Sequence, residues 1–112
     1  MSAIIERLKG LLDAGQDSAM LRFGLGQAQL AAGDVAEAVS HLRAAVDQDP
    51  GYSAAWKLLG QALTRLDDVP AAMEAYESGI TAAGERGDKQ AAKEMQVFLK
   101  RLRKRSDEVN GG

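Results

Sequence analysis

The stretch Leu25-Gly26-Gln27-Ala28 is repeated 34 residues later as Leu59-Gly60-Gln61-Ala62. The further residues that keep this offset are Asp34, Val35 and Ala38, which are matched by Asp68, Val69 and Ala72. Together these are seven identities over the 28 aligned positions 19–46, and they fall at small, apolar or turn positions. A fixed period of this size is typical of stacked helical repeats, in which each repeat is one supersecondary unit. The repeat therefore predicts an all-α fold.

The spacing of hydrophobic residues predicts about six helices. Apolar residues recur at intervals of three and four positions, which places them on one face of a helix. The predicted helices cover residues 4–12, 18–32, 35–48, 53–66, 69–82 and 88–105. Gly33 and Pro50-Gly51 mark two helix ends, because glycine tolerates a positive φ and proline cannot continue the helical hydrogen bonds. Asp34 and Asp68 are predicted N-caps, and residues 83–88 are predicted to form a turn.

Composition narrows the class of protein. Hydrophobic residues make up 46% of the chain but aromatic residues only 4%, which suits close packing of helices through small side chains. The net charge of −2 gives no overall field that would attract nucleic acid or acidic lipid. The absence of cysteine excludes disulfides and thiolate metal sites. Residues 1–15 lack a signal-peptide pattern, and no stretch approaches the roughly 18 apolar residues that span a bilayer, so we expect a cytoplasmic protein without a membrane partner.

Two sets of residues, one in each copy of the repeat, follow a known family pattern. The first set is Leu25-Gly26, Ala38, Leu42, Ala45 and Pro50. The second set is Trp56, Leu59-Gly60, Leu63, Ala72, Tyr76 and Gly79. This pattern resembles the tetratricopeptide repeat over residues 19–83. It departs from the family at Arg22, Gln29 and Gly84, which stand where the other copy has Trp56, Leu63 and Pro50.

The resemblance implies a right-handed superhelix of about six antiparallel helices in a single domain, residues 1–112. The expected parts are an N-terminal capping helix within 1–15, repeats at 19–52 and 53–86, a C-terminal capping helix at 87–105 and a flexible tail at 106–112. The capping helices are needed because one helical hairpin cannot bury its outer face alone.

The register also predicts which residues lie at helix contacts. Gly26 facing Ala38, and Gly60 facing Ala72, are expected to let paired helices approach closely. Residues Ile4, Leu8 and Leu11 lie one period before Ala38, Leu42 and Ala45. The first helix is therefore predicted to be the second half of a truncated repeat. Trp56 is interpreted as a packing residue, because the family places an aromatic side chain there.

The family resemblance also implies a binding site. In the family, the first helix of each repeat lines a concave groove that binds peptides or helices of other proteins. The corresponding residues here are Met20, Phe23, Gln27, Leu30 and Ala31 in the first repeat, and Ala54, Lys57, Gln61, Thr64 and Arg65 in the second. Gln27 and Gln61 can hydrogen-bond a peptide backbone, and Lys57 and Arg65 can hold a carboxylate. In the alternative interpretation, Met20, Phe23 and Leu30 pack under the sixth helix through Met95, Phe98 or Leu102.

These residues predict a non-catalytic protein-interaction module that binds a segment of another protein or a second copy of itself. Some family members bind a C-terminal carboxylate through five side chains, Lys, Asn, Asn, Lys and Arg, but only Lys57 matches that clamp here. The alternative function is nucleic-acid binding through a basic run in the last predicted helix. The run consists of Lys100, Arg101, Arg103, Lys104 and Arg105. No aromatic residue follows Phe98 within it, so we favour a protein partner.

No constellation of catalytic residues is found in the sequence. The glycines do not have the spacing of a phosphate-binding loop, and adjacent Ser40 and His41 point to different faces of a helix. His41 and Glu37 offer two metal ligands on one helix, whereas metal sites usually need three or four. We therefore expect no enzymatic activity, no cofactor and no metal.

Overall fold

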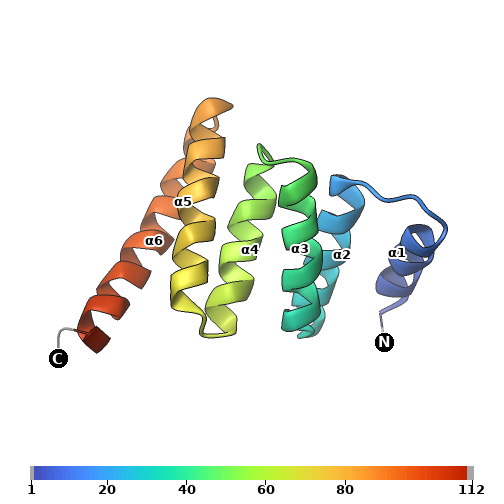
Figure 1. The fold of residues 1–112 in the computed structure, drawn as a ribbon, viewed down its shortest axis with the longest axis horizontal. Helices are drawn as coiled ribbons and strands as arrows, with labels where there is room; N and C mark the ends of the chain where they lie inside the picture. The colour runs from blue at the N-terminus through green and yellow to red at the C-terminus, as the bar shows by residue number, and fades with distance from the viewer. Residues whose placement is uncertain (1, 111–112) are drawn as a thin grey trace.

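The computed structural model describes residues 2–110 and places six α-helices in them, joined by short connections (Figure 1). The helices are α1 (Ala3–Asp13), α2 (Ala19–Ala32), α3 (Val35–Gln48), α4 (Ser53–Arg65), α5 (Val69–Glu85) and α6 (Lys89–Asn110). No strand occurs in this part of the chain. The molecule is elongated, with extents of 49 × 31 × 19 Å. The predicted all-α solenoid is confirmed.

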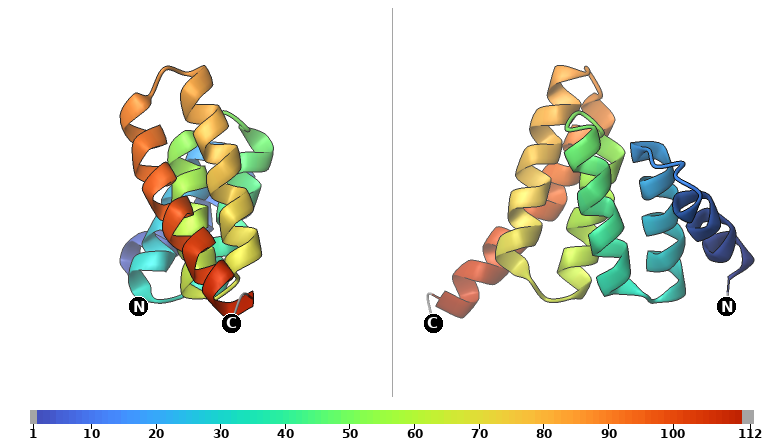
Figure 2. Two further views of the ribbon diagram at one scale, coloured as in Figure 1. Left: turned by 90° about the vertical axis from the view of Figure 1, so that its left-hand side faces the viewer. Right: turned by 45° about the vertical axis from the view of Figure 1, so that its right-hand side comes forward.

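The helices form two layers. The first helix of each predicted hairpin contacts the next first helix, since α2 contacts α4 and α4 contacts α6. The second helices α3 and α5 do not contact each other and lie in front of α2 and α6 in Figure 1. The side views in Figure 2 show α6 running alongside α5. The strongest packing is within the pairs α2–α3, α4–α5 and α5–α6.

Glycine is required where the paired helices approach most closely. A Cβ atom on Gly26 would lie 2.6 Å from Cγ of Leu42, and one on Gly60 would lie 2.5 Å from Cε1 of Tyr76. Real Cβ atoms do not make contacts this short. The predicted close approach is therefore correct. The backbone of Ala38 lies 3.3 Å from a Cβ placed on Gly26, and the large side chains of Leu42 and Tyr76 pack over the two glycines.

The observed helix N-caps agree only in part with those predicted from the sequence. The Asp68 side chain accepts a hydrogen bond from the backbone N–H of Ala71 (3.2 Å), as predicted for an N-cap. Asp34 precedes α3 but its side chain caps nothing. Ser18, which we expected inside the second helix, caps α2 by accepting from Leu21 N–H (3.1 Å).

Helix α5 is longer than predicted. The predicted turn at 83–88 is wrong for its first half, because α5 continues to Glu85 and only residues 86–88 connect it to α6. Ala82 and Ala83 are buried, and their packing outweighs the roughly 1 kcal/mol by which Gly84 disfavours a helix. Helix α5 therefore has 17 residues where α3 has 14.

The longer α5 shifts the register of α6. Helix α4 begins at Ser53 and α6 at Lys89, so their offset is 36 residues rather than 34. With this offset the core-facing residues of the two helices agree: the buried Leu59 and Leu63 are matched by the buried Met95 and Leu99, and the buried Ala55 by the partly buried Ala91. Gly60 is matched by Gln96, which is exposed. Helix α6 thus corresponds in register to the first helix of a repeat.

Helix α6 is longer at its C-terminal end than the predicted helix, which ended at residue 105. Helix α6 continues past residue 105 to Asn110, while residues 111–112 lie outside the described part of the chain. The ion pair of Arg105 with Asp67 in the α4–α5 turn holds this end of α6 against the rest of the molecule. One turn earlier, Leu102 is buried.

Helix α1 buries a different face from the one predicted. It packs on α2 through Ile5, which is buried, and through Leu8, whose Cδ1 faces Gly24. Ile4 and Leu11 are 47% and 40% exposed. Their counterparts in α3 are covered by α2, the preceding helix, and among the described residues no helix precedes α1. The hydrophobic period of the repeat therefore continues into α1, but the face that contains Ile4 and Leu11 is exposed.

A buried polar network joins the first two full helices. Gln29 is 0% exposed and donates to Oε2 of Glu37 (3.1 Å). Nδ1 of His41 lies 2.8 Å from Oε1 of Gln29 and 3.2 Å from the carbonyl oxygen of Glu37, so Nδ1 carries the hydrogen. Glu37 also pairs with Lys9 of α1 (3.5 Å). The network gives hydrogen-bond partners to the Gln29 side chain, whose burial without them would cost free energy.

We predict opposite effects for two glycine-to-alanine substitutions. Gly60→Ala forces α4 and α5 apart and lowers the free energy of unfolding by about 1–3 kcal/mol, as overpacking does. Gly10→Ala is the matched control, because a Cβ there meets nothing within 4 Å, and it raises stability by about 0.5–1 kcal/mol. Urea unfolding of both variants tests this. Unchanged stability of Gly60→Ala would contradict the close packing.

We also predict that stability falls in mild acid because of His41. Burial is the main cause that lowers the pKa of His41 below its ordinary value of 6.5, and the charge of Arg22 adds to it. The unfolded chain then binds a proton at a higher pH than the folded one. The contribution to stability is complete above pH 6.5 and is lost as the pH falls below that value.

The measurement is the free energy of unfolding from about pH 7.5 to about pH 5.5, above the range of ordinary carboxylates. His41→Gln keeps a donor for Gln29 but does not titrate, so its stability changes less over this range. An equal decline in both proteins would show that His41 is not responsible.

Candidate functional site

The candidate site is the surface formed by the first helices, which we call the α2/α4/α6 face. On α2 it contains Met20, Phe23 and Gln27. Met20 is 76% exposed, and the half-buried Phe23 ring lies 5.0 Å from the Tyr52 ring between centroids. Leu30, which was predicted to line the site, is buried in the core, while Ala31 is exposed.

Helix α6 does not cover this part of the surface. Within residues 2–110 it packs against α5 and α4 and makes no contact with α2. Met95 lies over Gly79 and Phe98 stacks near Tyr76, with 5.6 Å between ring centroids. The interpretation in which α6 covers α2 is therefore not supported for Met20, which is exposed. The half-buried Phe23 packs against Tyr52 and the core, and Leu30 lies in the same core cluster as Met95 and Leu102.

On α4, the two predicted carboxylate-binding cations already have acceptors. Nζ of Lys57 lies 2.8 Å from Oε1 of Glu94 on α6, and Arg65 donates to the carbonyl oxygen of Leu30 (3.1 Å). A ligand carboxylate would compete with Glu94 for Lys57. Sequence spacing within α4 gave no sign of this pairing, because Glu94 belongs to the helix whose register was missed.

The remaining predicted residues of α4 differ in how available they are. Thr64 donates its hydroxyl hydrogen to the carbonyl oxygen of Gly60 (2.7 Å), so it can only accept a further hydrogen bond. Ala54 is exposed and Gln61 is half-buried. Neither Gln27 nor Gln61 hydrogen-bonds another side chain in the described part of the chain, so both amides are free for a ligand.

Helix α6 adds site residues that the sequence analysis did not include. With the offset of 36, Lys93 and Val97 occupy the places of Lys57 and Gln61. Val97 is 48% exposed, which is unusual for a branched apolar side chain on a capping helix. Counting the period from the actual start of α6 would have revealed them. The α2/α4/α6 face is thus apolar at α2 and carries exposed lysines, Lys93 and Lys100, at α6.

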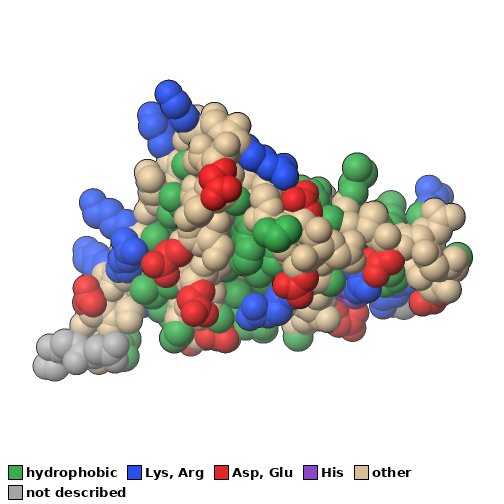
Figure 3. Space-filling view, turned by 45° about the horizontal axis from the view of Figure 1, so that its top comes forward, with side chains coloured by type: hydrophobic (Ala, Val, Ile, Leu, Met, Phe, Trp, Pro, Cys, Tyr) green, Lys and Arg blue, Asp and Glu red, His purple; other side chains and the backbone are tan. Residues whose placement is uncertain are grey.

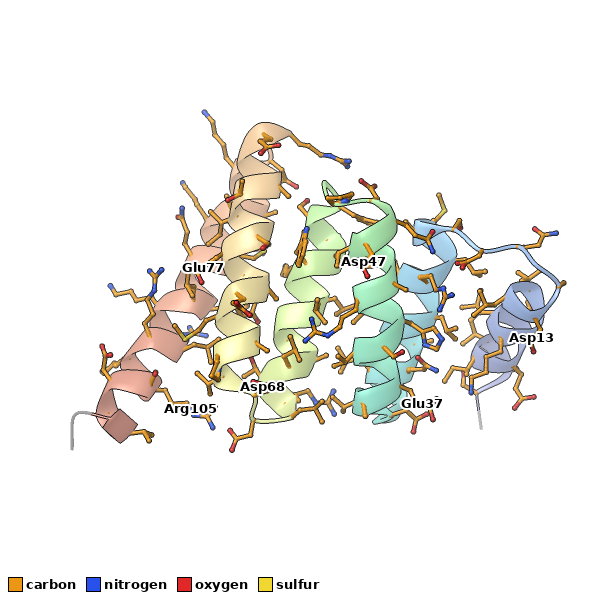
Figure 4. All side chains as sticks on the ribbon, viewed as in Figure 1. Asp13, Glu37, Asp47, Asp68, Glu77 and Arg105 are labelled. Carbon is orange, nitrogen blue, oxygen red and sulfur yellow. The ribbon has the colours of Figure 1, made fainter. Side chains whose placement is uncertain are left out.

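The basic run at the end of α6 is largely engaged within the molecule. Arg103 pairs with Glu77 (3.7 Å) and Arg105 pairs with Asp67. Figure 4 labels Glu77 on α5 and Arg105 near the end of α6. Arg101 lies over the ring of Phe98, 5.9 Å from its centroid. Only Lys100 and Lys104 have no such partner among the described side chains. A phosphate backbone would therefore meet few available cations here.

His41 and Glu37, which as two ligands on one helix are too few for a metal site, are part of the packing network. Nδ1 of His41 is directed at Gln29, and Glu37 is engaged by Gln29 and Lys9. Residues 2–110 contain no group of three or more side chains arranged to hold a metal ion. In the same residues, no helix combines the length and hydrophobicity needed to cross a membrane.

Comparisons with known proteins agree with this geometry. The family model of the tetratricopeptide repeat matches residues 5–53 and 23–87. The chain is 52% identical over 99 residues to a TPR repeat-containing protein of Pseudomonas aeruginosa, covering 88% of this chain and 94% of that protein.

Two solved structures are also similar. One is the solution structure of a protein from Bordetella parapertussis, with 49% identity and a TM-score of 0.80 over 97% of this chain and 94% of the other. The second is the Sgt2 TPR domain of Aspergillus fumigatus, with 30% identity and a TM-score of 0.82 over 96% of this chain and 69% of that one.

Proposed function

The chain belongs to the tetratricopeptide repeat family, and on that premise we propose that it is a non-catalytic interaction module that binds a segment of another protein along the α2/α4/α6 face. The observation that carries the proposal is that Met20 is 76% exposed on α2 beside the half-buried ring of Phe23, with no packing of α6 on α2. Together with the amides of Gln27 and Gln61 and the valine Val97, these side chains give the face a mixed apolar and polar surface for a partner.

The charge of the face indicates the chemistry of the partner. Apolar contact is available at Met20 and Phe23, hydrogen bonding at Gln27 and Gln61, and positive charge at Lys93 and Lys100. A segment with an apolar residue at one end and acidic residues toward the other would complement this order. Because Lys57 is already paired with Glu94, we assign recognition of the acidic residues mainly to α6.

Two other partners are less well supported. A second copy of the chain could use the same face, but the face is apolar only at α2 and a self-complementary arrangement would bring its lysines together. Nucleic acid is disfavoured because Arg103 and Arg105 are paired with carboxylates. A steep fall of binding with salt would be expected of phosphate contacts and would revive that alternative.

We predict that Phe23→Glu and Lys57→Glu weaken binding of the physiological partner. The partner is first identified by affinity capture from the native cell with mass spectrometry, and its affinity is then measured by calorimetry. Phe23→Glu places a charge in the apolar part, and Lys57→Glu brings a second carboxylate beside Glu94. Each should reduce affinity about tenfold or more, equivalent to about 1.4 kcal/mol.

The matched control is Ala36→Glu, an exposed position on α3 outside the α2/α4/α6 face. Its affinity should equal that of the wild type. If neither Phe23→Glu nor Lys57→Glu weakens any captured partner, the assignment of this face is wrong.

A further inference from the structure

A second candidate site lies away from the α2/α4/α6 face, between the α3–α4 turn and the C-terminal half of α5. It is a pocket of about 370 Å³. Its lining residues are Pro50, Gly51, Trp56, Ser78, Thr81, Ala82 and Glu85. Glu85 belongs to the three residues by which α5 exceeds α3, so the insertion that breaks the period also builds one wall of this pocket.

The pocket opens along the surface. Through Trp56 and Ser78 it continues into a smaller hollow lined also by Arg43, Leu59 and Glu74. Helices α3 and α5 do not touch each other, and α4 forms the floor between them. Figure 3 shows the molecule with the top of Figure 1 turned forward, and hydrophobic, acidic and basic side chains are all present on this surface. The hollow can therefore accept an extended segment as well as a single side chain.

Three hydrogen-bond donors of the pocket are already used. Nε1–H of Trp56 donates to the carbonyl oxygen of Pro50 (2.8 Å), and the backbone N–H of Gly51 donates to Oδ1 of Asp49 (3.2 Å). Thr81 gives its hydroxyl hydrogen to the carbonyl oxygen of Glu77 (3.2 Å). What remains is the Glu85 carboxylate and the oxygen of Thr81, which only accept, and the hydroxyl of Ser78, which can accept or donate. A ligand that satisfies them must be rich in donors.

The position of Glu85 is unfavourable unless it has a partner. It is the last residue of α5, where the helix dipole disfavours a negative charge. The nearest arginine in sequence, Arg86, lies over Gly51 and donates instead to Oδ1 of Asp49 (3.2 Å). Glu85 forms no ion pair within residues 2–110. A locally unfavourable residue without a compensating contact is a common sign of a functional position.

We propose that this pocket binds the guanidinium group of an arginine side chain in a partner polypeptide. The indole of Trp56 offers an aromatic face, on which a planar guanidinium stacks well. Glu85 supplies the opposite charge, and the oxygens of Thr81 and Ser78 accept further N–H groups. The methylene stem of the arginine packs against Pro50 and Ala82. The neighbouring hollow holds the residues that flank the arginine.

The experiment uses Trp56 as its own reporter, since it is the single tryptophan of the chain. Its indole N–H gives one peak in a ¹H–¹⁵N correlation spectrum. The probe is a short capped peptide with one central arginine between serine and glycine residues. Two control peptides replace that arginine by citrulline, its neutral isostere, or by lysine. We expect a saturable shift of the Trp56 peak with the arginine peptide, a weaker effect with lysine and none with citrulline.

Two variants test whether the carboxylate of Glu85 contributes to binding of the arginine peptide. Glu85→Gln should weaken binding of the arginine peptide about fivefold or more. Glu77→Gln is the matched control on the same helix, because Glu77 faces α6 and pairs with Arg103, and it should bind as the wild type does. Glu85 is exposed at a helix end, so neither the fold nor the core depends on it. The proposal is overturned by an equal shift with citrulline or lysine, by the lack of saturation, or by unchanged binding in Glu85→Gln.

Discussion

The contact of Gly60 with the ring of Tyr76, and its counterpart between Gly26 and Leu42, is the constraint on which the remaining structure depends. Without a Cβ on one helix, the backbone of the other can approach until a large side chain covers the glycine. This close pairing makes each hairpin a narrow unit whose outer surfaces are still apolar. Stacking of hairpins then buries those surfaces and places α2, α4 and α6 next to one another. The α2/α4/α6 face results from this stacking of the hairpins.

The sequence predicted most of the fold because each strong local signal agreed with the packing. Gly33 takes a positive φ of 88° after α2, and α3 starts and ends where its hydrophobic spacing indicated. The errors occurred where tertiary packing overrode a local signal. Gly84 looks like a helix end, but burial of Ala82 and Ala83 carries α5 past it. The predicted end of α5 was about one turn too early, and this error also shifted the predicted register of α6.

The same reasoning explains what could be predicted of the site. Family spacing placed Met20, Phe23, Gln27 and Gln61 on one surface, because that depends only on position within a helix. Spacing could not show that Glu94 reaches Lys57 or that Arg65 reaches Leu30, since both contacts cross between repeats. Nor could it show Val97, whose place depends on the length of α5. The pocket at Trp56 combines residues from a turn and two helices, so no sequence pattern describes it.

The two ends of the solenoid differ in how well a further helix could pack on them. At the N-terminal end, α1 presents Ile4 and Leu11 uncovered on the face where a full repeat places its preceding helix. A designed helix added before α1, with small residues at its contact, would find an apolar surface ready for it. At the other end, Gln96 stands where Gly26 and Gly60 allow close pairing, and Lys93 and Lys100 flank it. A designed helix packed closely on α6 would need a smaller residue than Gln96 at that contact, so an added helix is simpler to place before α1 than after α6.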